Sequence, residues 1–158
     1  MALSVGSSAP DFTLLTLREG KLDAVTLSSH KGEKNVVLLF YPGAFTPVCT
    51  QELCDVTSGL GQFAAVNAVV YGVSPDSPFA LAAWAKEFKI EFSLLSDYAH
   101  TVTQSYGVVW PDFAGLGPGT SRAVVLIDKE GTVQYVEVCE KLTDMPNLDA
   151  LQAKLAEL

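Results

Sequence analysis

Cysteine, histidine and basic residues are all scarce in this sequence of 158 residues. Three cysteines are too few, and odd in number, for the disulfide framework that stabilises small secreted domains. Ten Lys and Arg against 18 Asp and Glu give a net charge of −8, which argues against nucleic acid or an anionic membrane as a partner, because such surfaces need clustered positive charge. His30 and His100 have no ligand-like partners at metal spacing, so we expect both at the surface, with no metal and no cofactor.

Long apolar runs are also absent, since no stretch reaches the ~18 to 20 apolar residues of a membrane-spanning helix. The first residues, Met1–Gly6, have neither the basic nor the apolar region of a secretion signal. We therefore expect no membrane association and a reducing, cytoplasmic location. No linker, internal repeat or low-complexity segment interrupts the chain, and with 49% hydrophobic residues it should form a single domain over residues 1–158.

Hydrophobic periodicity predicts alternating strands and helices. Strands are expected at 12–17 and 24–27, which form an N-terminal hairpin, and at 35–41, 68–74, 92–95, 122–127 and 132–138; helices are expected at 47–66, 79–88, 101–106 and 147–158. Residues 108–121 form a long loop with two exposed-looking aromatic residues, Trp110 and Phe113. This order predicts an α/β sandwich whose mixed sheet is parallel at helical crossovers and antiparallel at hairpins.

One segment places a cysteine in the first turn of a helix, directly after a buried strand. Pro42 and Gly43 end the strand, and Thr46-Pro47 is typical of an N-cap followed by proline at the first helical position. Cys49 then occupies the third helical position. Backbone N–H groups there lack helical partners and the helix dipole is positive, so the anionic sulfur is favoured over the neutral thiol.

The pattern Pro42-x-x-x-Thr46-x-x-Cys49, with Glu52 just beyond and Arg122 on a later strand, resembles the signature of the peroxiredoxins, the AhpC/TSA family. The similarity extends over most of the chain. It implies a thioredoxin-like fold and a thiol-dependent peroxidase that reduces hydrogen peroxide and organic hydroperoxides through Cys49. Thioredoxin itself would carry Cys-x-x-Cys where this chain has Thr46-Pro47-Val48-Cys49, so reaction with peroxide is expected rather than direct disulfide exchange.

The resemblance also assigns roles around the sulfur. Thr46, Arg122 and the backbone N–H groups near Cys49 would hold the peroxide in line with the sulfur, and Pro42 would shield the site from water. Glu52, one turn beyond Cys49, could steer Arg122. Taken singly, Pro42 could merely end a strand, Thr46 could merely cap a helix and Arg122 could be a surface cation; the combination favours the catalytic interpretation.

Cys54 is the candidate for the thiol that resolves the oxidised Cys49. Leu53, Val56, Leu60 and Phe63 form an apolar stripe, and Cys54 lies roughly 130° from its centre at 100° per residue, so a core position is disfavoured. The Cys-x-x-x-x-Cys spacing resembles the bacterioferritin-comigratory, or Q-type, branch, in which the later cysteine resolves. The sequence around Cys49 also resembles one-cysteine branches of the family, in which an external thiol resolves the oxidised cysteine.

A disulfide between these cysteines would require local unfolding. Five helical residues rise about 7.5 Å, which with the lateral offset exceeds the ~7 Å limit between α-carbons. Gly59 and Gly61 weaken the helix just downstream. Cys139 is expected to be inert, with an alternative role as a resolving or intermolecular cysteine.

A hydroperoxide and a thioredoxin-like or glutaredoxin-like reductant are the expected partners of a monomer or homodimer. A redox-sensing or chaperone-like binding protein on the same scaffold stays open as an alternative. The glycine-rich run 115–119 is no nucleotide fingerprint, because a strand and not a helix follows it.

Overall fold

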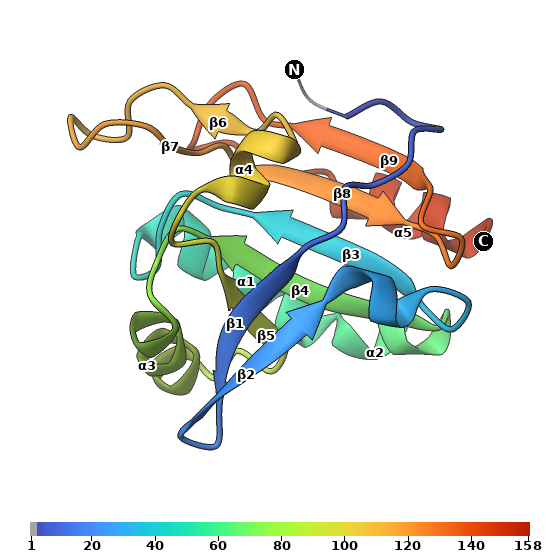
Figure 1. Cartoon of the computed structure of the whole chain (residues 1–158), viewed down its shortest axis with the longest axis horizontal. Helices are drawn as coiled ribbons and strands as arrows, with labels where there is room; N and C mark the ends of the chain where they lie inside the picture. Colours follow the sequence, from blue (N-terminus) through green and yellow to red (C-terminus); the bar gives the residue numbers. More distant parts are fainter. Residues whose placement is uncertain (1–2) are drawn as a thin grey trace.

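A seven-stranded mixed sheet organises the computed structural model, which describes residues 3–158 (Figure 1). Met1 and Ala2, at the start of the segment considered above for a secretion signal, lie outside the described residues. The strands of the sheet, in spatial order, are β2 (Lys21–Thr26), β1 (Thr13–Arg18), β5 (Ser93–Ser96), β4 (Ala68–Ser74), β3 (Asn35–Phe40), β8 (Ala123–Ile127) and β9 (Val133–Val138). Strands β3, β4 and β5 are parallel, whereas β1–β2, β3–β8 and β8–β9 are antiparallel. The expected mixed sheet with an N-terminal hairpin is therefore confirmed.

Strand β3 lies inside the sheet and is buried along its whole length, because both of its faces are covered. Side chains alternate along a strand. Val37 and Leu39 accordingly join one hydrophobic cluster and Leu38 and Phe40 the other, on the opposite face. This explains why the strand is a continuous apolar run in the sequence rather than an alternating one.

Helices cover both faces of the sheet. The helices are α1 (Pro47–Ser58), α2 (Leu60–Ala65), α3 (Pro78–Phe88), α4 (Thr101–Ser105) and α5 (Leu148–Ala156), with a 3-10 helix at Leu27–His30. The first cluster contains buried residues of α1, α2, α3 and α5, and the second contains those of α4 and the N-terminal hairpin. In Figure 1, α4 lies in front of the sheet and α1, α2 and α5 lie behind it. None of the helices between residues 3 and 158 has the length and apolar character needed to cross a membrane.

Three segments differ from the sequence-based prediction. The strand expected at 24–27 is β2 at Lys21–Thr26, and Leu27 begins the 3-10 helix. The helix expected at 47–66 is two helices, because the chain leaves helical geometry at Gly59 (φ −98°, ψ 7°) between α1 and α2. Glycine weakens a helix interior by about 1 kcal/mol relative to alanine, which makes this position a natural break. The expected loop 108–121 contains a small antiparallel ladder, β6 (Val109–Trp110) with β7 (Gly119–Thr120).

Candidate active site

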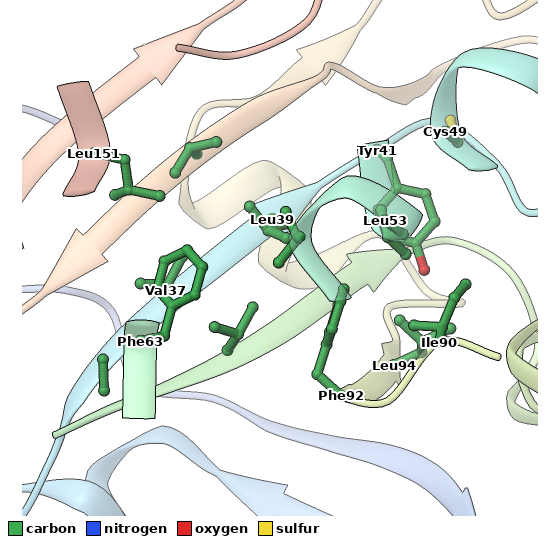
Figure 2. Close-up of a cluster of buried hydrophobic side chains, with 14 of the residues drawn as sticks. Val37, Leu39, Tyr41, Cys49, Leu53, Phe63, Ile90, Phe92, Leu94 and Leu151 are labelled. Atoms are coloured by element: carbon green, nitrogen blue, oxygen red, sulfur yellow. The ribbon is translucent and has the colours of Figure 1, made fainter. Parts of the chain in front are cut away.

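Cys49 lies in the first turn of α1, at the carboxyl end of β3. Thr46 is in the N-cap position (φ −79°, ψ 146°) and Pro47 is the first helical residue, so Cys49 is at the third helical position, as the sequence predicted. The loop that connects β3 to α1 includes Phe45 with φ +65°, a region that residues other than glycine rarely adopt. Figure 2 shows Cys49 at one end of the first hydrophobic cluster, near Tyr41 and Leu53. The sulfur is fully buried.

Arg122 contacts the Cys49 sulfur. The register of β3 with β8 explains how a residue 73 positions away arrives there: Phe40 pairs with Ala123, so Arg122, just before β8, lies beside the start of the cysteine loop. Its Nη2 donates to Sγ of Cys49 at 3.1 Å. The side chain is 1% exposed, so Arg122 is not a surface cation. A guanidinium this close to sulfur stabilises the thiolate.

Two further partners fix the Arg122 guanidinium. Its Nη1 forms a buried ion pair with the Glu52 carboxylate, and its Nε donates to the Leu142 carbonyl at 3.0 Å. Burial raises the pKa of Glu52 to about 7, although the Arg122 charge acts in the opposite direction. Burial pulls the pKa of Arg122 down, but the charges of Glu52 and Cys49 outweigh it and leave that pKa raised. The guanidinium is therefore a fixed cation aimed at the sulfur.

Thr46 occupies the expected cap position, but its side chain does not cap the helix. Its hydroxyl donates instead to the Gly43 carbonyl at 2.8 Å. Because the hydroxyl proton is used in this bond, the oxygen lone pairs stay available to accept a hydrogen bond from an incoming hydroperoxide.

Phe113 packs over the loop, and Pro42 lies within it. Pro42 is buried, in keeping with the expected shielding position. A Cβ on Gly43 would lie 3.6 Å from the Phe113 ring, so this ring packs over the glycine. Trp110 and Phe113 are both half-buried rather than exposed, and Trp110 Nε1 donates to the Asp112 carbonyl at 3.1 Å. The expectation of two exposed aromatic residues is wrong, because β6 and β7 fold this segment back.

Cys54 lies on α1 outside both hydrophobic clusters, as the helical angle predicted. It is half-buried and its Sγ is 3.8 Å from the Phe88 carbonyl, at the end of α3.

All three cysteines are free thiols that form no disulfide. Cys139 is buried, and this burial, together with the charge of Glu137, raises the pKa of its thiol to about 11. The neutral thiol therefore dominates at Cys139, which disfavours its alternative role as a resolving cysteine.

Sequence reasoning missed two supports of this site. Thr50 Oγ1 donates to the Thr46 carbonyl at 2.9 Å and accepts from Trp84 Nε1 at 3.1 Å, so it ties the first turn of α1 to α3. The Leu142 carbonyl is invisible in the sequence, since any residue supplies one. A tryptophan among the apolar residues of α3 is a partial signal, because its buried N–H needs an acceptor.

His30 is half-buried, with part of its side chain at the surface. Its Nε2 is 2.7 Å from the Tyr71 hydroxyl, with which it shares a hydrogen bond. Across residues 3–158, no group of three or more His, Cys, Asp or Glu side chains is arranged to hold a metal ion.

The family model of the AhpC/TSA family matches residues 5–136. The chain belongs to the AhpC/TSA family. The peroxiredoxin assignment is therefore confirmed, and with it a thiol-dependent peroxidase activity.

Members of the AhpC/TSA family resemble the chain in sequence and in structure. The protein designated bcp of Haemophilus influenzae is 39% identical over 137 residues, which cover 85% of each chain. The chloroplastic peroxiredoxin Q of Sedum lineare is 41% identical over 131 residues, 83% of this chain and 67% of the relative. The crystal structure of peroxidoxin BcpB from Mycobacterium tuberculosis superposes with a TM-score of 0.83 at 30% identity, covering 98% of this chain and 97% of that one. The expected thioredoxin-like fold is thereby confirmed.

Proposed function

We propose that Cys49 is the peroxidatic cysteine, and that Arg122, Thr46 and Pro42 form its peroxide site. The 3.1 Å contact between Arg122 Nη2 and the buried Cys49 sulfur carries this proposal. The thiolate attacks one peroxide oxygen; the S–O bond forms, the O–O bond breaks, and the departing oxygen takes a proton to leave as water or an alcohol. Cys49 becomes a sulfenic acid.

Stabilisation of the breaking O–O bond must supply most of the rate. A thiol of ordinary acidity is only about 3% ionised at pH 7, so full ionisation gains roughly thirtyfold, or about 2 kcal/mol of barrier. Arg122 and the N–H groups at the start of α1 can stabilise the negative charge that develops on the two oxygens. Glu52 acts through Arg122, by holding its guanidinium at the sulfur.

Cys54 completes the cycle in this proposal. Its sulfur attacks the sulfenic sulfur of Cys49, an S–S bond forms and water leaves. An external dithiol, a thioredoxin-like or glutaredoxin-like protein, then reduces the disulfide. The position of Cys54 outside the core supports this role, and the partial exposure of its side chain makes it accessible to a partner.

Mass spectrometry after one equivalent of hydrogen peroxide tests the assignment. The wild-type protein should form an internal Cys49–Cys54 disulfide. Cys49→Ser should abolish turnover, whereas Cys54→Ser should leave the first oxidation intact and stop recycling by a thioredoxin-like protein. Cys139→Ser is the matched control and should turn over like the wild type.

Other outcomes select the alternatives. A lasting sulfenic acid or mixed disulfide on Cys49 of the wild type would indicate a one-cysteine mechanism with external thiol resolution. Reaction of Cys49 no faster than that of a free thiol would contradict the peroxidatic role and favour a redox-sensing or chaperone-like binding protein.

We also propose that the chain acts as one domain, as a monomer or homodimer, in the cytoplasm. The two hydrophobic clusters lie on opposite faces of one sheet, which supports a single folding unit. The three unpaired cysteines suit a reducing compartment.

A further inference from the structure

Asp76 lies just beyond the carboxyl end of β4, the strand that runs parallel to β3. Its Oδ2 accepts two hydrogen bonds, one from the backbone N–H of Ala44 at 2.8 Å and one from the Ser74 hydroxyl at 2.7 Å. The backbone of Asp76 is itself held, because its carbonyl accepts from the Ser96 hydroxyl of β5 at 2.7 Å. The carboxylate is thus fixed to the sheet while it binds the cysteine loop.

The bond to Ala44 orients the peptide that holds Thr46. The N–H of Ala44 and the carbonyl of Gly43 belong to the same peptide unit, which is planar and rigid. Asp76 binds this unit on its N–H side, and the Thr46 hydroxyl binds it on its carbonyl side at 2.8 Å. Rotation of this one peptide would therefore move the acceptor of the Thr46 hydroxyl.

The next residue shows why the peptide needs such a support. Phe45 has φ +65°, which costs on the order of 1 kcal/mol or more for a residue with a side chain and persists only where neighbouring contacts enforce it. A hydrogen bond to a carboxylate is roughly twice as strong as a neutral one. The Asp76–Ala44 bond lies directly before the strained residue and opposes its relaxation.

We propose that Asp76 is a positioning residue for peroxide reduction, which sets the orientation of the Thr46 hydroxyl through the Gly43–Ala44 peptide. This inference rests on the proposed role of Thr46 at Cys49. Asp76 does not touch the sulfur; it acts on the loop that carries the peroxide-binding hydroxyl. The thiolate itself depends on Arg122 and the start of α1 and should be largely independent of Asp76.

Two reactions of Cys49 separate positioning from general damage. Alkylation by iodoacetamide needs the thiolate and a path to the buried sulfur, whereas peroxide reduction also needs the oriented hydroxyl. Asp76→Ala should lower the second-order rate constant with hydrogen peroxide about 10- to 100-fold, the loss expected for an Å-scale misplacement. Alkylation of Cys49 should change by less than about threefold, because the thiolate is retained. Asp76→Asn should restore much of the peroxide rate, because its amide oxygen can accept from Ala44.

Asp23→Ala is the matched control. It removes a partly exposed carboxylate of β2 whose partners, Arg18 and the backbone N–H of Ala24, belong to the N-terminal hairpin and not to the cysteine loop, so its peroxide rate should stay close to that of the wild type. A peroxide rate for Asp76→Ala within about twofold of the wild type, against the loss that misplacement predicts, would overturn the proposal. So would a parallel loss of peroxide and iodoacetamide reactivity, which indicates a damaged helix.

A double-mutant cycle with Thr46→Val separates this inference from the proposed function. If both residues act through one hydroxyl, Asp76→Ala should have little further effect in the Thr46→Val protein. A wild-type peroxide rate for Thr46→Val would contradict the proposed role of Thr46. A slow Thr46→Val protein with a fast Asp76→Ala protein, or additive losses, would contradict the role of Asp76 alone.

Discussion

Arg122 carries one positive charge between two acidic groups, the Glu52 carboxyl and the Cys49 sulfur. Both of these groups are fully buried, and the Glu52 carboxyl ionises against a desolvation penalty that the guanidinium offsets in part. Burial raises the pKa of Glu52 from its ordinary value of 4.5 to about 7, although the Arg122 charge acts in the opposite direction. A substantial fraction of Glu52 is therefore protonated in the folded protein near neutral pH.

This proton makes stability depend on pH. Between pH 4.5 and about 7 the folded protein keeps the Glu52 proton that the unfolded chain releases, so the contribution of Glu52 to stability is full below this window and is lost as pH rises through it. Glu52→Gln removes the titration. Its free energy of unfolding relative to wild type should rise by on the order of 2 to 3 kcal/mol from the acid to the alkaline side of the window.

Urea unfolding of the reduced protein across this window measures the effect. Glu140→Gln, which changes an exposed acidic residue just beyond the carboxyl end of β9, is the control. Its unfolding free energy should follow the same pH dependence as that of the wild type. Parallel curves for Glu52→Gln and wild type would show that the carboxyl does not titrate there.

At the scale of elements, the sequence located the strands closely but not every break. The strand at 68–74 was predicted with the bounds that the structure has, because its apolar run ends at a proline. The predicted helix 47–66 divides into α1 and α2 in the structure. The sequence did not reveal this break, because the apolar stripe of the helix continues across Gly59. The β6–β7 ladder was missed because two residue pairs leave no periodic pattern.

The break after α1 bears on disulfide formation. Cys49 and Cys54 lie on one intact helix, so the first turns must unwind before the two sulfurs can meet. Oxidation should therefore reduce the hydrogen-exchange protection of amides 49–55. Gly59→Ala should make α1 and α2 more continuous, stabilise the helix by about 1 kcal/mol and slow disulfide formation roughly fivefold.

Stopped-flow measurement of disulfide formation after a peroxide pulse tests this. Gly61→Ala is the control: it stabilises α2 by a similar substitution, and a Cβ there would meet nothing within 4 Å, but it lies beyond the break. Unchanged protection of residues 49–55 on oxidation would contradict the unwinding.

At the scale of the whole molecule, the site joins segments that are far apart in the sequence. Cys49 and Glu52 follow β3, Arg122 precedes β8, and the carbonyl of Leu142 follows β9. The sequence identified the chemically distinctive side chains, because cysteine, threonine and arginine occur there in a recognisable pattern. The Leu142 carbonyl and the Asp76 contact could not be predicted, since both depend on the tertiary register of neighbouring strands.

The protein that surrounds this site carries a net charge of −8. Reduction of the oxidised protein by glutathione, an anionic thiol, should accelerate about two- to fivefold when ionic strength rises from about 0.01 M to about 0.15 M. The reason is that the screening length falls from about 30 Å to about 8 Å, which weakens the repulsion between the two negative charges. Uncharged dithiothreitol is the control and should show little change. Equal salt dependence of both thiols, measured as rates of disulfide reduction, would contradict this electrostatic account.

The hydrogen bond from Trp84 to Thr50 provides an optical reporter of the catalytic cycle. The indole of Trp84 is fully buried and its N–H is held by a residue in the first turn of α1, the part that must unwind. Loss of that partner changes the polarity around the chromophore, so its emission should follow the opening and closing of the helix in real time. The second tryptophan, Trp110, bonds within its own loop and contributes a steady background.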